Sequence, residues 1–550
     1  MKKTPSSSLA SRFFNQPKAV WATAFAAMVG FMSIGLVDPI LTSIATGLHA
    51  TPSQVSLLFT SYFAVTAAMM LVTGAVSSRF GGRATLLLGA ALIAVFAALS
   101  GTSQSVTALV LYRGGWGLGN ALFVATALSV IVASARGGAA ISILLYEAAL
   151  GLGLSVGPLL GAALGSYSWR YPFYGTATLM VIGFLAIAFF LEPVTVARER
   201  TSLKDPLRAL ADKGLFAVAL SAFFYNYGFF TVLAFVPFVL HVSARSTGLI
   251  FFGWGVLLAI FSVFVAPRLQ RRFSETRLLR FSLAAFALLL LVMAMGSSTA
   301  TIVAVVLSGA LMGVNNTVFT EMALEISSCP RPVASAGYNF VRWIGGVIAP
   351  FAAPKLAELN GTLPFLLAAA AACLSMVVLY ARRAHLGRFA TSPAKREGAG
   401  ATLPARQMPA SVLAGIDGSG YDRFVLQRAV EEVRMKGGTV EVVHVRAYEV
   451  FDEFSAATES LVYGERLVEE ALAALRHEGV EARGCCLTAQ GGLIAEILIE
   501  HGKRVGAKTI LLGCRHDEDG RTLLHGSVAE LAMKLAPQRV ELVSPARSAA

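Results

Sequence analysis

Apolar residues along the first 381 positions form runs of about twenty, separated by short polar or basic stretches. An α-helix rises 1.5 Å per residue, so a run of this length spans a hydrocarbon core of about 30 Å. The pattern predicts an all-α membrane bundle of twelve helices. Their expected spans are residues 19–43, 55–78, 84–101, 106–133, 139–165, 170–191, 214–240, 247–267, 279–297, 300–324, 333–357 and 362–381.

A connection of mixed charge, from Glu192 to Lys213, follows the sixth predicted helix. It divides the bundle into two halves of six helices, at about 19–191 and 214–381. A basic turn follows the second helix of each half. Such repeats are typical of secondary transporters whose substrate site lies near the bilayer midplane. The repeat alone leaves a channel or a receptor open.

The composition changes after the last apolar run, which ends the predicted transporter domain at residues 1–381. Residues 382–407 are rich in Ala, Gly, Pro and Ser and have no hydrophobic periodicity, which indicates a linker. Residues 408–550 then alternate short β-rich runs, such as TVEVVHV and KTILLGC, with helical stretches. Four βα units and a last strand predict a C-terminal α/β domain with a doubly wound parallel sheet.

Charge is distributed unevenly along the 550 residues, of which 56% are hydrophobic and only 14% charged. Residues 1–407 hold 29 Lys and Arg against 11 Asp and Glu, whereas residues 408–550 hold 16 against 21. Cationic loops beside a lipid bilayer explain the basic part better than nucleic-acid binding, so no nucleic-acid partner is expected. Loops on one side of the predicted bundle hold 24 Lys and Arg and those on the other hold three. We therefore expect a multi-pass protein of the inner cell membrane with both termini in the cytoplasm.

The cysteines have no spacing that suggests a metal site or a disulfide framework. The sequence therefore predicts free thiols and no metal. The five residues are Cys329, Cys373, Cys485, Cys486 and Cys514.

Four ionisable residues, Asp38, Arg113, Glu147 and Arg342, fall within predicted membrane helices, where a charge is costly and functional by default. Glu147 lies about ten residues beyond Arg136, roughly 15 Å into the bilayer. A carboxyl at this depth can take up and release a proton during transport. The alternative is a permanent Glu147–Arg113 ion pair that only joins helices. Asp38 lies nearer the outer end of the first helix, where its side chain could reach water.

Three motifs then resemble those of the major facilitator superfamily. The loop after the second helix reads GAVSSRFGGR, with Ser78 at the family's usual acidic position. RGGWGLGNA in the fourth helix is similar to the buried-arginine motif, which implies a role in proton coupling for Arg113. GLSVGPLLG in the fifth helix resembles the signature of proton-coupled drug antiporters. The motif residues in the loop and in the fifth helix are Gly74, Arg79, Gly81, Arg83, Gly153, Gly157, Pro158 and Gly161.

The fifth-helix motif also has a direct physical consequence. Its glycines permit close backbone approach, and Pro158 removes a backbone hydrogen bond. We expect this helix to bend where it packs against the other half.

Further polar residues within the membrane helices are expected to line a substrate cavity. A wide apolar cavity with few polar anchors favours a lipophilic or cationic ligand, although Arg342 could instead attract an anion. The candidates are Asn120, Tyr146, Tyr225, Asn226, Asn315, Asn316, Tyr338, Asn339 and Arg342.

The C-terminal domain resembles the universal stress protein family. Asp417 ends a first strand like that near adenine in nucleotide-binding members, and Val445 ends the second. The phosphate-loop spacing from Gly513 to Gly526 and Ser527 is intact, with His516 replacing a glycine. The resemblance implies ATP or another adenine nucleotide with Mg²⁺, and a homodimer through this domain. A folded module that has lost nucleotide binding is the alternative.

The leading hypothesis is a proton-coupled exporter of drug-like or lipophilic small molecules, regulated by its cytoplasmic domain and not an enzyme. Two alternatives stay open: a membrane-anchored nucleotide or stress sensor, and a metabolite or lipid exporter.

Overall fold

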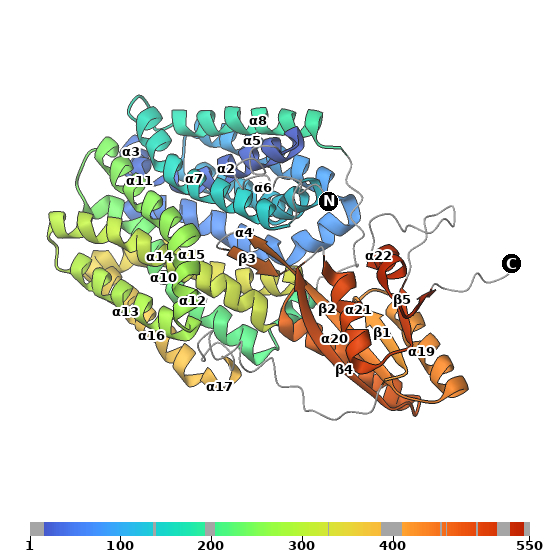
Figure 1. The fold of residues 1–550 in the computed structure, drawn as a ribbon. Coiled ribbons are helices and arrows are strands. Elements are labelled where there is room, and N and C mark those ends of the chain that lie inside the picture. The colour runs from blue at the N-terminus through green and yellow to red at the C-terminus, as the bar shows by residue number, and fades with distance from the viewer. Residues whose placement is uncertain are drawn as a thin grey trace, which may run out of the picture. The chain divides into compact units, whose positions relative to one another are not determined.

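The computed structural model separates into two compact units, shown as a ribbon in Figure 1. The helical unit comprises Met1–Leu324 and Pro332–Ala399, and the sheet unit comprises Glu325–Arg331 and Gly400–Ala550. The structure describes residues 16–135, 139–192, 204–327, 329, 331–386, 410–451, 454–457, 459–490, 493–513 and 528–543.

Long helices joined by short turns make up the first half of the helical unit. They begin with polar caps where the sequence provides them: Thr51 and Gln54, for example, form a reciprocal capping box at the start of the second long helix. The elements are α2 (Lys18–Gly35), η1 (Asp38–Ile40), α3 (Leu41–Gly47), α4 (Pro52–Phe80), α5 (Gly82–Thr102), α6 (Val106–Ser134), α7 (Ala139–Gly165) and α8 (Tyr171–Phe190).

The second half repeats this architecture. The elements are α9 (Asp205–Ala209), α10 (Lys213–Val239), α11 (Ala244–Ile260), η2 (Phe261–Val265), α12 (Ala266–Arg272), α13 (Glu275–Ala294), α14 (Ser298–Ile326), α15 (Arg331–Leu359), α16 (Leu363–Ala381) and α17 (Arg383–Leu386).

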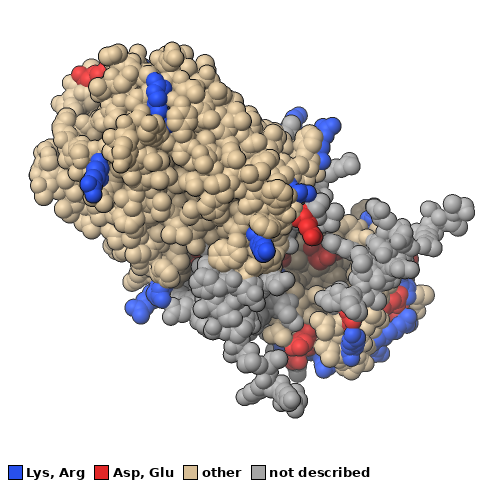
Figure 2. All heavy atoms as spheres, turned by 90° about the horizontal axis from the view of Figure 1, so that it is seen from above, with Lys and Arg blue, Asp and Glu red and all other residues tan. Residues whose placement is uncertain are grey.

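Eleven helices among the described residues are long and apolar enough to cross a membrane. The eleventh of the twelve expected spans corresponds to α15, which has 29 residues but is not among those eleven. Its sequence includes Asn339, Arg342 and Lys355, which lower its hydropathy. The face of the helical unit drawn in Figure 2 carries only scattered charged side chains, as a surface toward lipid requires.

The first membrane segment is not one continuous helix. α2 ends at Gly35, and the short 3₁₀ turn η1 connects it to α3. Pro39 lies in this turn. Proline has no backbone N–H to donate, and its ring clashes with the carbonyl group four residues earlier. These two effects explain why the helix is interrupted.

The sheet unit alternates strands and helices. Its elements are β1 (Val412–Ile416), α19 (Asp422–Lys436), β2 (Val440–Phe451), β3 (Phe454–Ala457), α20 (Leu461–His477), β4 (Ala482–Gln490), α21 (Ile494–Val505), β5 (Thr509–Gly513), α22 (Val528–Leu535) and β6 (Arg539–Val543).

The described strands form one sheet in the order β3-β2-β1-β5-β6, with β4 also paired to β2. All pairs are parallel except that of β2 with β3, an antiparallel strand that the sequence pattern did not predict. On one face, Val440 and Val442 pack with residues of α19 and α20. On the other, Val443 and Ile510 pack with residues of α21 and α22. The expected doubly wound parallel domain is therefore present.

Candidate functional site

Arg113 is a fully buried cation in the first half of the bundle. Its guanidinium carbon lies 4.4 Å from the ring centroid of Tyr62 on α4 and 4.7 Å from that of Trp116 on α6. None of its guanidinium nitrogens has a hydrogen-bond partner among the described residues. Aromatic faces thus stabilise this charge, but they leave its hydrogen-bonding capacity unused.

Close contact between α4 and α6 holds the rings of Tyr62 and Trp116 in place beside Arg113. A Cβ atom at Gly117 would lie 2.4 Å from the carbonyl oxygen of Tyr62, so only glycine allows this approach. The Thr66 hydroxyl donates to the Gly117 carbonyl at 3.1 Å. The ring of Tyr62 is therefore fixed by backbone packing as well as by its own contacts.

Asp38 lies on η1 and is also fully buried. Neither carboxylate oxygen accepts a hydrogen bond from a described residue, while its charge interacts with that of Arg113. Asp38 does not reach water, as its position near the helix end would have allowed, because α7 packs over η1. The structure thus brings two of the predicted proton-coupling residues into one buried region.

Glu147, the third of these residues, lies on α7, but its side chain is outside the described residues. The alternative of a Glu147–Arg113 ion pair therefore lies outside them as well. Two candidates for the cavity lie on α6 and α7. Asn120 is buried on α6, and the Tyr146 hydroxyl of α7 donates to the Val124 carbonyl at 3.3 Å.

The glycines of the fifth-helix motif face α2 of the same half. Cβ atoms at Gly153, Gly157 and Gly161 would lie 2.5, 2.5 and 2.2 Å from carbonyl oxygens of α2 or the residue after it. Pro158 packs against Gly35 at the end of α2, where an added Cβ would lie 3.0 Å from the ring. The motif therefore forms a backbone contact within the first half.

Contact with the second half uses glycines of α11 that sequence reasoning missed. A Cβ at Gly248 would lie 2.8 Å from the carbonyl oxygen of Pro158, and one at Gly255 would lie 2.8 Å from the Cα of Ser155. Helix α7 is thus packed closely against α2 and α11. In the sequence, the only feature that could have indicated this contact is the spacing of seven residues between Gly248 and Gly255.

The loop motif between α4 and α5 forms a sharp turn at Gly81, whose φ of +84° favours glycine. Arg83 donates from Nη2 to the carbonyl of Ala188 near the end of α8, at 2.7 Å. Gly74 and Arg79 lie in the last turns of α4. Ser78 donates to the Ala75 carbonyl of its own helix, at 2.9 Å. Arg83 therefore links this turn to α8.

Arg342 of α15 organises a second polar cluster. Its Nη1 donates to Asn316 Oδ1 at 2.9 Å, and lies 3.3 Å from the Tyr338 hydroxyl and 3.4 Å from that of Thr320. Its Nε is buried without a partner among the described residues. The structure thus joins three of the predicted cavity residues and adds Thr320 from α14, one helical turn after Asn316.

The other cavity candidates mostly join helices. The Tyr225 hydroxyl donates to the Met312 carbonyl at 3.1 Å, and the Asn226 amide donates to the Arg342 carbonyl at 3.0 Å. Asn339 donates to Ser335 Oγ at 3.2 Å on its own helix. Asn315 is fully buried, and its amide has no partner among the described residues.

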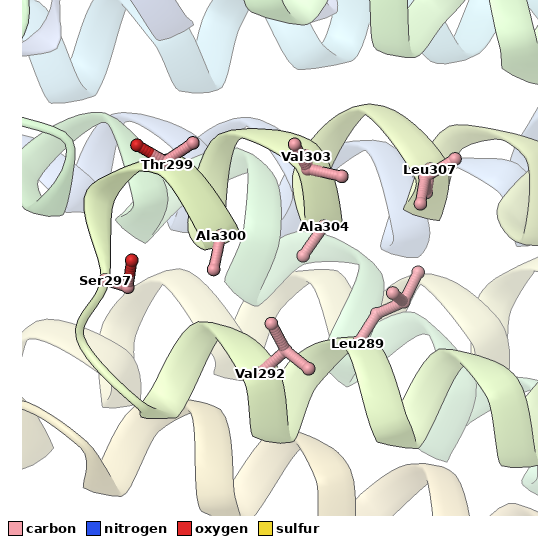
Figure 3. Close-up of a pocket in the computed structure, with 8 residues that line it drawn as sticks. All are labelled: Leu289, Val292, Ser297, Thr299, Ala300, Val303, Ala304 and Leu307. Carbon is pink, nitrogen blue, oxygen red and sulfur yellow. The ribbon is translucent and has the colours of Figure 1, made fainter.

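A groove between α13 and α14 is separate from both clusters (Figure 3). It has a volume of ≈ 430 Å³ and is almost entirely apolar. None of the predicted site residues lines it. Its lining residues are Leu289, Val292, Ser297, Thr299, Ala300, Val303, Ala304 and Leu307.

In the sheet unit, three predicted nucleotide-binding residues lie on neighbouring strands, but Val445 lies within β2, which continues to Phe451, and does not end its strand as expected. Asp417 directly follows β1, Val445 is one residue beyond the Ile416–His444 pair, and Gly513 ends β5. Ligands of doubly wound sheets bind at the carboxyl edge of the sheet. Gly526, Ser527 and His516 lie outside the described residues.

Two ionisable groups lie beside this edge. Burial raises the pKa of Asp422 to about 6, although its carboxylate accepts hydrogen bonds from the Asp417 and Gly418 amides. His444 is buried, with Nδ1 at 2.9 Å from the Ile416 carbonyl and Nε2 against Glu459. Burial lowers the pKa of His444, but the bond to Glu459 and its charge outweigh that effect and leave it raised.

Comparisons with known proteins agree with both units. The Major Facilitator Superfamily model matches residues 23–350 and 215–416, and the Universal stress protein family model matches residues 408–544. The "Multidrug efflux protein YfmO" of Bacillus subtilis (strain 168) is 48% identical over 389 residues, which are 70% of this chain and 98% of that protein. The "Tetracenomycin C resistance and export protein" of Streptomyces glaucescens is 30% identical over 208 residues, 37% of each chain.

A solved D-xylose-proton symporter has the same helical fold, with a TM-score of 0.55 at 14% identity, over 68% of this chain and 98% of that one. Members of this family with several apolar helices are expected in the cell membrane. The chain belongs to the Major Facilitator Superfamily of transporters and carries a C-terminal universal stress protein domain.

Proposed function

We propose that this chain is a proton-coupled exporter of drug-like, lipophilic compounds, in which Asp38 carries the proton and Arg113 interacts with its charged form. The similarity to a multidrug efflux protein over 98% of that protein's length supports drug export. One observation carries the proton coupling: Asp38 is fully buried, and neither of its oxygens has a hydrogen-bond partner among the described residues.

A buried carboxyl without such partners is suited to change its charge during a cycle. When Asp38 is ionised, the positive charge of Arg113 attracts it. When Asp38 is protonated, the rings of Tyr62 and Trp116 are the groups among the described residues that stabilise the cation. Each protonation state therefore favours a different packing of the interrupted first segment against α6, which is the two-state behaviour that alternating access needs.

We further propose that α15 also spans the membrane, which brings the number of spans to twelve. Polar residues within a membrane helix are tolerated where they face other helices, and Arg342 and Tyr338 meet Asn316 and Thr320 of α14. Low hydropathy is then the consequence of an interior polar cluster. The Nε of Arg342, which has no partner among the described residues, could donate to a polar or anionic group of the cargo.

Twelve spans and the distribution of loop charges favour both termini in the cytoplasm. Cysteines introduced at two exposed positions, Gln104 in the third connection and Thr299 in the first turn of α14, test this topology. Both should react with an impermeant thiol reagent added outside cells. Reaction only after the membrane is opened would contradict the proposed orientation.

Flux in proteoliposomes tests the transport mechanism. The purified chain should move lipophilic cations faster when a proton gradient is imposed, and Asp38→Asn should abolish this stimulation, since the amide keeps the shape and loses the proton. Glu147→Gln tests the other membrane carboxyl in the same way. Glu358→Gln, an exposed residue on α15, is the matched control and should retain full flux.

Two outcomes would count against the proposal. Unchanged gradient dependence in both Asp38→Asn and Glu147→Gln would remove the proton-carrier role. No flux of any probe by the folded chain would instead favour a membrane-anchored sensor.

For the sheet unit we propose regulation by an adenine nucleotide with Mg²⁺. The adjacency of Asp417, Val445 and Gly513 at the carboxyl edge supports it. Calorimetry on the full-length chain should give weak ATP binding, and His516→Gly should tighten it, because glycine lets the backbone approach a phosphate closely. No heat with either chain would favour a module that has lost nucleotide binding.

A further inference from the structure

Glu441, Cys485 and His501 form a compact cluster inside the sheet unit. Glu441 is the second residue of β2, Cys485 lies in β4, and His501 lies in the second half of α21. Their ligating atoms all lie within 4.8 Å of one another. Glu441 and His501 are buried, and Cys485 is partly buried.

The sheet register explains why they meet. β2 pairs with β4 so that Glu441 is opposite Arg483 and Val443 is opposite Cys485. Side chains alternate between the faces of a strand, so these residues share one face. Helix α21 packs on that face, where Leu498 and Ile499 contact the same apolar core as Val443 and Cys485. This places His501 beside the two strands.

The distances match those between the ligands of one cation. His501 Nε2 is 3.6 Å from Cys485 Sγ and 3.1 Å from Glu441 Oε1, and Cys485 Sγ is 4.0 Å from the same oxygen. Ordinary Zn–S, Zn–N and Zn–O bonds in a tetrahedron separate their ligands by about 3.4–3.6 Å. All three observed separations agree with this to within about half an ångström.

Hydrogen bonds join these three groups only in pairs. His501 Nε2 and the Cys485 thiol both face Oε1 of Glu441, and the thiol sulfur also faces the same ring nitrogen of His501. The carboxylate oxygen can accept from both groups, but the thiol contact, at 4.0 Å, is long for a hydrogen bond. A cation at the centre would bind all three atoms at once.

The surroundings orient and isolate these groups. Arg483 donates to Oε2 of Glu441, which leaves Oε1 directed at His501, as outer partners of metal ligands commonly do. Burial, followed by the charge of Glu441, raises the pKa of the Cys485 thiol to about 12. Without a cation this thiol is therefore not a reactive nucleophile at neutral pH.

We propose that Glu441, Cys485 and His501 bind a divalent cation of the Zn²⁺ class, with three protein ligands and a fourth position for water or an exchangeable group. Mixed thiolate, imidazole and carboxylate ligands suit Zn²⁺ better than Mg²⁺ or Ca²⁺. The site lies near the amino ends of β2 and β4, away from the carboxyl edge that holds Asp417 and Gly513. It is thus separate from the proposed nucleotide site.

Cobalt titration of the full-length protein in detergent, after chelator treatment, tests this site. One equivalent of Co²⁺ should give the near-ultraviolet absorption of a cobalt–thiolate bond, and Zn²⁺ should displace it. Cys485→Ser should abolish the absorption. His501→Asn and Glu441→Gln should weaken binding at least about 100-fold, more than the roughly 10- to 100-fold expected for Arg483→Gln as an outer partner.

Neighbouring cysteines provide matched controls. Cys486 packs with the core on the opposite face of the sheet, and Cys486→Ser and Cys514→Ser should retain both absorption and affinity. The wild-type spectrum tests thiolate ligation even if a variant fails to fold. Cobalt bound without thiolate absorption, or absorption kept in folded Cys485→Ser, would overturn the proposal, as would the absence of binding at micromolar metal.

Discussion

In the helical unit, Asp38 and Arg113 are fully buried, yet neither forms a hydrogen bond with a described residue. In the sheet unit, the similarly buried Glu432 is bound by two cations: Arg428 Nη2 donates to it at 3.3 Å, and Lys436 donates to its other oxygen. Burial of a charge is costly unless it is paired. The buried charge of Glu432 therefore contributes to the stability of the sheet unit. In the helical unit, hydrogen bonds do not offset the cost of burying Asp38 and Arg113. Such a cost is expected where function requires the charges.

The strongest test of this contrast removes Arg113, the buried cation without a hydrogen-bond partner among the described residues. Arg113→Met should lower gradient-driven flux at least about 100-fold, a loss typical of removed proton chemistry. It should also lower the free energy of unfolding by about 3 kcal/mol, because Asp38 is left without an opposite charge. Proteoliposome flux and tryptophan fluorescence measure the two effects, since all five Trp residues precede residue 382.

A double variant separates the two roles of this pair. Adding Asp38→Asn to Arg113→Met should restore most of the stability and none of the flux. If the double variant is as unstable as Arg113→Met alone, the charges are not coupled and the contrast between the units fails.

The next test concerns the backbone contact between α2 and α7. A methyl group at Gly161 would lie 2.2 Å from the carbonyl oxygen of Leu36, and no flexible side chain can move aside. Gly161→Ala should cost about 1–3 kcal/mol and lower flux roughly tenfold, as overpacking and displacement of α2 predict. Gly361→Ala is the control, because a methyl group there meets nothing within 4 Å. Equal thermal midpoints and flux for the two variants would show that close approach is not required.

Removing the paired charge of Glu432 should affect stability and not transport. Glu432→Gln should lower the stability of the sheet unit by about 2 kcal/mol, the usual value of hydrogen bonds to charged groups, and leave flux unchanged. Glu431→Gln, at an exposed neighbour, should cost less than about 0.5 kcal/mol. Calorimetry of the full-length protein measures both. Lost flux in Glu432→Gln with a folded helical unit would mean that the paired network is functional.

The smallest effect is expected from pH. The pKa of His444 is raised above its ordinary value of 6.5 by Glu459, against the lowering effect of burial, and both ring nitrogens face acceptors. The resulting stability is present below about pH 6.5 and is lost as pH rises through the folded-state pKa. The thermal midpoint of the sheet unit should fall over this range, and Glu459→Gln should flatten the curve. A rise in the midpoint would contradict the assigned cation.

The sequence determined most of the architecture. Apolar runs of about twenty residues act locally, since each must satisfy its own backbone in lipid, and eleven of the expected spans are helices of sufficient length and hydropathy. Alternating β-rich and helical runs likewise predicted the parallel sheet. Three elements departed from these patterns. The first span is interrupted at η1, polar residues that meet α14 lower the hydropathy of α15, and β3 pairs antiparallel with the extended end of β2.

Tertiary structure alone decided which functional groups meet. The position of Asp38 in the sequence would have allowed its side chain to reach water, but the turn at Pro39 and the packing of α7 bury it. The cysteines showed no metal spacing in sequence, yet strand register and helix packing bring Glu441, Cys485 and His501 together from positions up to 60 residues apart. Hydrophobic periodicity is a property of each segment by itself, whereas convergence of polar atoms depends on which segments pair and on the register that packing selects.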